Sequence, residues 1–177
     1  MPTLDRDQSQ LLIIDFQVKL MPAIDGAEAA LLNADRLIEA AHIFRLPVLF
    51  TEQNPKGLGP TVSELSSRPI EVLAKMSFDA CRAEDFMTRM SSRRDVVVAG
   101  CEAHVCVLQT VLGLVEAGRR VFVVEDAIGA RHPASKQAAL ARMARHGAEI
   151  VTTEMVIFEW LETAAHPRLK DVIALIR

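Results

Sequence analysis

Cys106 is the cysteine whose position best suits nucleophilic chemistry. It closes the phrase Cys101-Glu-Ala-His-Val-Cys106, which follows the apolar run 96–100 and precedes a helical pattern of apolar residues. A thiol at the amino end of a helix is expected to have a lowered pKa, because free amides and the helix dipole favour the thiolate. The same amides could bind a developing oxyanion. A small buried side chain is the commoner role of a cysteine, and this alternative stays open here, as it does for Cys81 and Cys101.

Two charged residues could assist such a thiol. Asp15 directly follows the apolar run 11–14, so it should emerge at the carboxyl end of a strand and face a crevice. Lys75 ends the phrase Val-Leu-Ala-Lys, and its neighbours Ala74 and Met76 are apolar. Each residue also has an ordinary alternative role, a turn cap for Asp15 and a solvated ammonium for Lys75. Gln17 either supports the site by a hydrogen bond or faces solvent.

Short apolar segments alternate with longer helical patterns, and these elements would carry the three residues. The predicted strands are rich in β-branched residues and cover residues 11–16, 47–51, 96–100, 121–125 and 149–151, with a sixth near 70–75. The predicted helices cover residues 27–44, 85–90, 105–116 and 134–145. This alternation indicates a mostly parallel, six-stranded sheet with helices on both faces. In such sheets ligands bind at the carboxyl ends of the strands.

The chain is predicted to form a single domain, residues 1–177. Half of its residues are apolar, which is enough for one core at this length. No internal repeat or shift in composition marks a second domain. The segment Gln53 to Thr61 concentrates glycine and proline, so we expect a surface loop that could form a lid over a site.

Charge and composition argue against several classes of partner. The formal net charge is -3 and the pI is near 6.0, with scattered basic residues, which disfavours binding to nucleic acid or anionic membranes. Residues 1–10 do not resemble a signal peptide, and no apolar run approaches the roughly 20 residues of a membrane span. Three cysteines, an odd number, do not suit a disulfide framework. We therefore expect a cytoplasmic protein with reduced thiols.

No metal or cofactor is expected. The five histidines form no pair at metal-ligand spacing, and neither a Cys-x-x-Cys nor a His-Glu-x-x-His phrase occurs. Gly57 and Gly59 give only Gly-x-Gly, without the third glycine of a dinucleotide cradle, and the sequence contains no phosphate-loop phrase.

Taken together, these residues resemble the isochorismatase-like superfamily of cysteine hydrolases from Gln10 to about Lys170, and most closely its isochorismatase domain-containing branch. The shared motifs are Asp15-x-Gln17, Thr51-Glu-Gln with the loop to Thr61, Lys75 with Phe78, Gly100-Cys-Glu-Ala-His-Val-Cys106 and Ala165-His-Pro. Several ordered motifs are more specific than any one alone. The resemblance therefore favours the catalytic roles of Asp15, Lys75 and Cys106.

The resemblance implies a three-layer α/β/α fold, a homo-oligomer, and hydrolysis of a small-molecule amide or related acyl C–N bond through a thioester. Cys106 would be the nucleophile, Asp15 the proton acceptor, and Lys75 the residue that stabilises the thiolate. It also implies a cis peptide bond between Cys101 and Glu102, with the amides of Glu102 and Cys106 forming an oxyanion hole. We expect the Glu102 carboxylate to point away, toward a basic partner.

Two departures limit what the resemblance implies. The nicotinamidase branch carries an Asp/His metal cluster after its second strand, where this chain has Glu52-Gln-Asn-Pro-Lys, so neither zinc nor nicotinamide is carried over. Cleavage of isochorismate is a vinyl-ether hydrolysis that need not use a cysteine, whereas Cys106 favours acyl chemistry.

Other functions and the mode of assembly stay open. A non-enzymatic interaction protein could retain the same fold. A redox-responsive protein could oxidise Cys106 reversibly, with Cys101 or Cys81 as the resolving thiol. For the oligomer, the apolar segment Met155 to Leu161 is a candidate subunit contact.

Overall fold

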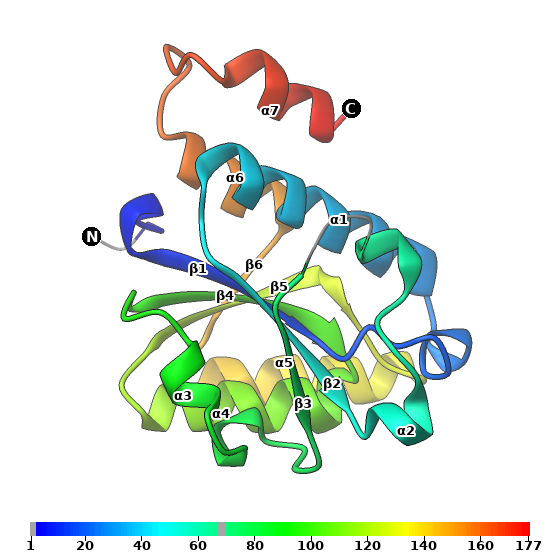
Figure 1. Ribbon diagram of the computed structural model, residues 1–177. Helices are drawn as coiled ribbons and strands as arrows, with labels where there is room; N and C mark the ends of the chain where they lie inside the picture. The colour runs from blue at the N-terminus through cyan, green and yellow to red at the C-terminus, as the bar shows by residue number, and fades with distance from the viewer. Residues whose placement is uncertain (1–2, 67–69) are drawn as a thin grey trace.

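The protein is built on a parallel β-sheet with helices on both faces (Figure 1). The structure is a computed structural model that describes residues 3–66 and 70–177. Across the sheet the strand order is β3-β2-β1-β4-β5-β6, and every described pairing is parallel. The strands are β1 (Ser9–Ile14), β2 (Val48–Gln53), β3 (Val72–Lys75), β4 (Asp95–Cys101), β5 (Arg120–Gly129) and β6 (Glu149–Val151). The predicted six-stranded sheet is confirmed.

The helices are α1 (Ala27–Phe44), α2 (Pro55–Leu58), α3 (Phe86–Arg89), α4 (Leu108–Glu116), α5 (Pro133–Arg145), α6 (Thr153–Leu161) and α7 (Leu169–Leu175). A π-helical turn, Ala103–Val107, leads directly into α4. Short 3₁₀ turns lie at Arg6–Gln8, Met21–Ala23, Ser63–Leu65 and Ala80–Arg82. The helix predicted for residues 105–116 therefore begins earlier, with the π-helical turn.

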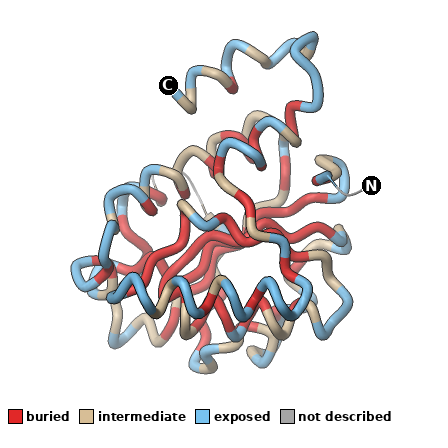
Figure 2. Tube along the Cα trace, turned by 180° about the vertical axis from the view of Figure 1, so that it is seen from behind, coloured by how far each residue is buried: buried red, intermediate tan, exposed pale blue. Residues whose placement is uncertain are grey.

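Successive side chains of a strand point to opposite faces of the sheet, which explains why the strands are apolar throughout. In β1, Leu11 and Ile13 pack on the face covered by α1, α6 and α7, whereas Leu12 and Ile14 pack on the face covered by α3, α4 and α5. Figure 2 shows the buried residues concentrated along the strands and the inner sides of the helices. Two apolar layers separated by a sheet make the predicted three-layer α/β/α sandwich.

Four strands end at other residues than predicted: β2 ends at Gln53 instead of residue 51, β4 ends at Cys101 instead of residue 100, and β1 and β5 also differ. β1 ends at Ile14 instead of residue 16, because Asp15 has a φ of 53°, which interrupts the extended backbone. β5 continues to Gly129 instead of ending at residue 125, after a register shift against β4 between Val98 and Gly100. Charged residues at 125 and 126 interrupt the apolar run of β5, so the pattern gave no sign that the strand resumes.

The C-terminal region contains two helices, α6 and α7, that the sequence patterns did not predict. The candidate subunit contact, Met155 to Leu161, lies within α6. Four of its side chains are buried in the core of the chain itself: Val156, Ile157, Trp160 and Leu161. The expectation is therefore wrong for most of this segment, and of its apolar side chains only Met155 and Phe158, which are 45% and 46% exposed, remain available for contact.

The strand order reverses at the centre of the sheet, between β1 and β4. Ile14, the last residue of β1, is in register with Thr51 of β2 and Gly100 of β4. A Cβ atom on Gly100 would lie 2.5 Å from the carbonyl oxygen of Ile14, so this close approach of the strands requires glycine. Ligands in open α/β sheets bind at such a reversal. Asp15 is the next residue after Ile14.

The loop predicted for residues 53–61 contains the short helix α2 and is fastened at its end. Glu52 Oε1 accepts hydrogen bonds from the Thr61 amide at 2.7 Å and the Thr61 hydroxyl at 2.8 Å. Whether this segment acts as a lid stays a prediction.

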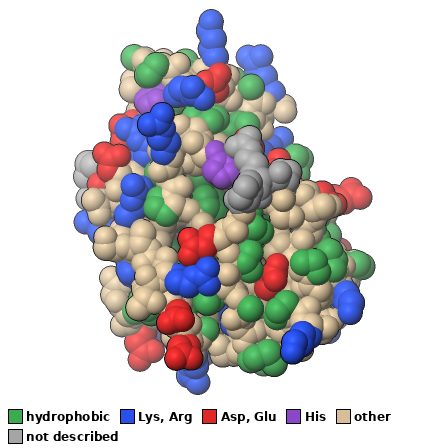
Figure 3. Space-filling view, viewed as in Figure 1, with side chains coloured by type: hydrophobic (Ala, Val, Ile, Leu, Met, Phe, Trp, Pro, Cys, Tyr) green, Lys and Arg blue, Asp and Glu red, His purple; other side chains and the backbone are tan. Residues whose placement is uncertain are grey.

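The described surface carries mixed charge. On the face seen in Figure 3, basic side chains are interspersed with acidic and hydrophobic ones. Within residues 3–66 and 70–177, no helix is both long and apolar enough to cross a membrane.

Candidate active site

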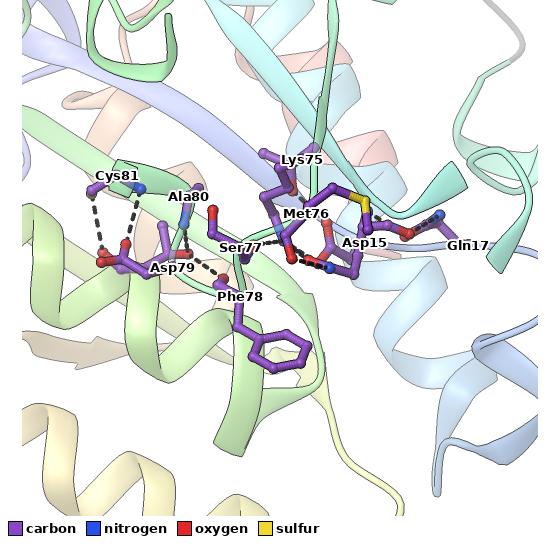
Figure 4. A network of polar contacts seen from close by, with 12 residues as sticks. Asp15, Gln17, Lys75, Met76, Ser77, Phe78, Asp79, Ala80 and Cys81 are labelled. Carbon is purple, nitrogen blue, oxygen red and sulfur yellow. Dashed lines mark hydrogen bonds and ion pairs between the residues drawn. The ribbon is translucent and has the colours of Figure 1, made fainter. Parts of the chain in front are cut away.

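A buried ion pair joins two of the predicted site residues at the carboxyl ends of β1 and β3 (Figure 4). Lys75 Nζ donates to Asp15 Oδ2 at 2.8 Å, and both side chains are fully buried. Thr51 Oγ1 donates to the other carboxylate oxygen of Asp15 at 2.6 Å. Lys75 Nζ also donates to Gln53 Oε1 at 2.8 Å. Neither residue is therefore the exposed turn cap or the solvated ammonium that the sequence left open.

The backbone of Asp15 explains how its carboxylate comes to face Lys75. The Asp15 amide still donates to the Thr51 carbonyl at 3.1 Å, as in a parallel ladder, but its φ of 53° then turns the chain out of the strand. Non-glycine residues rarely adopt this conformation, and it persists where the surrounding contacts enforce it, often at functional sites.

Gln17 has the supporting role that the sequence allowed. Its side chain is fully buried and forms two hydrogen bonds with the backbone of Gln53, accepting from the amide at 2.8 Å and donating to the carbonyl at 3.1 Å. It also donates to the Gly59 carbonyl at 2.6 Å. Gln17 thus fastens the end of β2 and the following loop beside Asp15.

Cys106 lies in the π-helical turn after β4 and interacts with both members of the ion pair. The residue is 6% exposed. The pKa of its thiol is raised to about 12, chiefly by burial and then by the negative charge of Asp15, and the positive charge of Lys75 opposes this rise. The structure therefore brings Asp15, Lys75 and Cys106 together.

The expectation of a lowered Cys106 pKa is wrong. It considered the helix end and the lysine, but not the burial of the sulfur or the nearby carboxylate. A raised pKa means that the resting thiol is neutral near pH 7, so a nucleophilic role requires a base in contact with it.

Asp15 and Lys75 do not occur together among the main influences on either of the other two cysteines. The pKa of Cys81 is raised to about 12, chiefly by burial and by the negative charge of Asp79. The negative charge of Glu116 makes a smaller contribution. Cys101 is fully buried, and burial raises the pKa of its thiol to about 12. All three thiols are free.

Glu102 adopts the predicted cis peptide bond with Cys101. Its carboxylate has the expected basic partner: Arg131 Nε donates to Glu102 Oε1 at 2.6 Å, and a second guanidinium nitrogen donates to Oε2 at 3.3 Å. The oxyanion hole formed by the amides of Glu102 and Cys106 stays a prediction.

The family model described as the Isochorismatase domain matches residues 9–155. The chain belongs to the isochorismatase family. Isochorismatase domain-containing protein 2 of Danio rerio is 35% identical over 170 residues, which covers 95% of this chain and 86% of that protein. This relative agrees with the branch that the sequence motifs resemble.

Solved structures share the isochorismatase-like hydrolase fold. The MAR1 ribonuclease of Caenorhabditis elegans has a TM-score of 0.94 at 34% identity, over 98% of this chain and 92% of its own. YcaC of Escherichia coli, described as an octameric hydrolase of unknown specificity, has a TM-score of 0.86 at 26% identity, covering 99% and 95%. YcaC of Pseudomonas aeruginosa, solved with hexane-2,5-diol and covalent acrylamide, has a TM-score of 0.85 at 27% identity, covering 99% and 96%. These descriptions apply to those proteins.

Two polar residues of this isochorismatase-family site received no role from the sequence patterns. Thr51 bonds to Asp15, and Gln53 accepts from Lys75. The signal that singled out Asp15, a polar residue at the end of an apolar strand, applies equally to the end of β2 and could have found both.

A metal site is a separate question for this family member. Within the described part of the chain, no group of three or more His, Cys, Asp or Glu side chains is placed to hold a metal ion. The independence of this chain from zinc and other cofactors stays a prediction.

Proposed function

We propose that the chain is a cysteine-dependent hydrolase that cleaves a small amide or related acyl C–N bond through a thioester on Cys106. The observation that carries this proposal is the position of one thiol close enough to a buried Asp15–Lys75 pair for both charges to act on its pKa. The Asp15 and Lys75 side chains are fully buried, whereas the Cys106 residue keeps 6% exposure, so Cys106 is the most accessible of the three residues.

The acylation step begins from the neutral thiol. Asp15 accepts the proton from Cys106 Sγ while the sulfur attacks the carbonyl carbon of the substrate. The C–N bond of the tetrahedral intermediate then breaks, and the amine leaves with the proton that Asp15 had accepted. The positive charge of Lys75 compensates negative charge on the sulfur.

The deacylation step regenerates the enzyme. Asp15 accepts a proton from a water molecule that attacks the thioester carbonyl, the C–S bond breaks, and the proton returns to the sulfur as the acid product leaves. In both steps the amides of Glu102 and Cys106 would donate hydrogen bonds to the carbonyl oxygen as it becomes negative.

Two features of the YcaC proteins support related parts of the proposal. Acrylamide is a small, thiol-reactive amide, and it is bound covalently in YcaC of Pseudomonas aeruginosa. YcaC of Escherichia coli is octameric, which supports a homo-oligomer here. We further propose a small-molecule substrate, no nucleic-acid partner, and a cytoplasmic location.

A panel of small amides and related acyl C–N compounds tests the function. Wild-type protein should hydrolyse at least one member, and Cys106→Ala should lose that activity while retaining its melting temperature. Cys106→Ser is a matched control, because its hydroxyl is close in size but a weaker nucleophile, and its activity should also be low. Undiminished hydrolysis by Cys106→Ala would contradict the proposal.

A further inference from the structure

The segment that carries Lys75 is anchored at its beginning to the end of β2. The amide of Asn54 donates to the Lys75 carbonyl at 2.8 Å. Gln53 Nε2 donates to the Met76 carbonyl at 2.7 Å, while the oxygen of the same side chain accepts from Lys75 Nζ. These bonds fix the backbone on one side of the lysine.

Thr110 of α4 anchors the other end of this segment. Its hydroxyl accepts from the Ala80 amide at 3.0 Å and donates to the Phe78 carbonyl at 3.4 Å. The Thr110 carbonyl also accepts a long hydrogen bond from Cys81 Sγ, at 3.8 Å. Figure 4 shows the segment running from Lys75, beside Asp15, to Cys81. Thr110 is fully buried, so water does not compete for its hydroxyl.

Apolar packing does little to hold the middle of the segment. Met76 is 72% exposed and Phe78 is 51% exposed. A segment with few buried apolar contacts depends on its hydrogen bonds for a fixed position. The bonds from Thr110 therefore matter more here than they would in a loop with a buried core of its own.

Thr110 lies in α4, which continues directly from the π-helical turn that carries the Cys106 thiol. It follows Cys106 by four residues, about one helical turn, and Gly113 follows it by three, so these positions share one side of the helix. A Cβ atom on Gly113 would lie 2.9 Å from Asp79 Oδ1 and 3.0 Å from Cys81 Sγ. Residues 79–81, at the start of the 3₁₀ turn Ala80–Arg82 and here called the 79–81 turn, thus lie directly against α4.

We propose that Thr110 is a positioning residue, which sets the distance between the Lys75 ammonium and the Cys106 thiol by fastening the lysine-bearing segment to the helix of the cysteine. This inference rests on the proposed roles of Lys75 and Cys106. Thr110 acts only through those residues, without contact with the substrate. Small displacements of a catalytic group can cost about 100-fold in rate, so the anchor should have a measurable effect.

Peptide-resolved labelling with iodoacetamide, followed across neutral and alkaline pH, tests the proposal without a known substrate. Thr110→Val keeps the shape of the side chain but loses the hydroxyl, and it should slow Cys106 labelling by about tenfold or more near neutral pH, with its pH profile shifted upward toward that of Lys75→Ala. Thr110→Ser keeps the hydroxyl and should restore the wild-type rate and profile. Thr153→Val is the matched control, because Thr153 is also buried and donates to Asp126 at 2.9 Å, but on α6 across the sheet.

A purely structural role would give another pattern. General loosening of the fold would speed the labelling of Cys81 and Cys101 and would not selectively slow Cys106. That result, or an unchanged Cys106 rate in Thr110→Val, would overturn the proposal. If Thr110→Val does not fold, Gly113→Ala tests the same contact by pushing against the 79–81 turn: slower Cys106 labelling supports the proposal, and an unchanged rate opposes it. Failure of the proposed function itself is distinguishable, because Lys75→Ala would then leave Cys106 labelling unchanged.

Discussion

Asp15 and Lys75 carry opposite charges into a part of the molecule from which water is excluded. Their mutual attraction and the hydrogen bonds from Thr51 to Asp15 and from Lys75 to Gln53 offset the cost of removing both charges from water. Breaking such a pair by removing one partner typically costs about 3–5 kcal/mol, because the other charge stays buried. Each single variant therefore requires a stability measurement beside its activity measurement.

Asp15→Asn and Lys75→Ala should shift the pKa of Cys106 in opposite directions. The carboxylate disfavours the thiolate and the ammonium favours it, so Asp15→Asn should lower the pKa from about 12, and Lys75→Ala should raise it further. The ultraviolet absorbance of the thiolate during an alkaline titration measures both shifts. Shifts in the same direction would show that changes in burial dominate.

Turnover should fall by roughly 10²- to 10⁴-fold in both variants, although their thiol pKa values diverge. Asp15→Asn lacks the proposed proton acceptor even where its thiolate is more abundant. The double variant Asp15→Asn/Lys75→Met removes both charges, and it is the control for stability, because it leaves neither charge unpaired. Its turnover should be no lower than that of the worse single variant. Near wild-type turnover in either single variant would exclude the role proposed for that residue.

At the scale of elements, the alternation of apolar patterns was enough to predict several strands and helices. The parallel sheet, α1, and the strand ends that carry Asp15 and Lys75 follow from local pattern and from strand geometry. The continuation of β5 beyond residue 125 depends on pairing with β4 after a register shift, which no local pattern records. The neutral Cys106 thiol likewise depends on burial and on the placement of Asp15, both of which are properties of the folded chain.

The amino end of β4 contains a second charged cluster, remote in the strand from the site. The Asp95 side chain is fully buried, and it accepts from Arg120 Nε at 2.9 Å and from the Asp5 amide at 3.1 Å. Burial alone would raise the pKa of Asp95, but the hydrogen bond from Arg120, with these other contacts, holds the pKa below its usual value of 3.8.

Asp95→Asn should lower the free energy of unfolding by about 2 kcal/mol near neutral pH, because hydrogen bonds to a charged group are lost. The folded-state pKa lies below the unfolded one, so the contribution of Asp95 is complete above the unfolded value and is lost as the pH falls through the folded value. The difference between wild type and variant should therefore shrink in acid. Urea unfolding at several pH values measures it.

Asp171→Asn provides a control for that experiment, because the Arg168–Asp171 pair has a similar separation of 2.9 Å but is about half exposed on both sides. Its effect should stay below about 1 kcal/mol. A difference between wild type and Asp95→Asn that grows in acid would contradict the assignment.

At the scale of the whole molecule, the strand order 3-2-1-4-5-6 places the ends of β1, β2, β3 and β4 around one reversal point. Residues 15, 75 and 106 are far apart in the sequence, and this topology is what brings them together. The fold alone says nothing of the substrate, which depends on the side chains around the thiol.

The oligomeric state is also a property of the whole molecule. We expect light scattering at micromolar concentration to give a multiple of the 19.5 kDa chain mass. Phe158→Glu places a charge at one of the two exposed apolar positions of α6 and should reduce the mass if this surface is the contact. A wild-type monomer would contradict the homo-oligomer, whereas an unchanged oligomer in Phe158→Glu would place the contact elsewhere.

The most direct test of the central claim is the order in which the three cysteines react with iodoacetamide in the folded protein near neutral pH. All three thiol pKa values are raised to about 12, but Cys106 is the thiol on which Asp15 and Lys75 both act, so it alone has a proposed base beside it as well as a positive charge that favours the thiolate. Peptide-resolved mass spectrometry should therefore find Cys106 labelled first, ahead of the more exposed Cys81, and Lys75→Ala should abolish that lead. Faster labelling of Cys81 or Cys101 in the folded wild-type protein would contradict the assignment of Cys106 as the activated nucleophile.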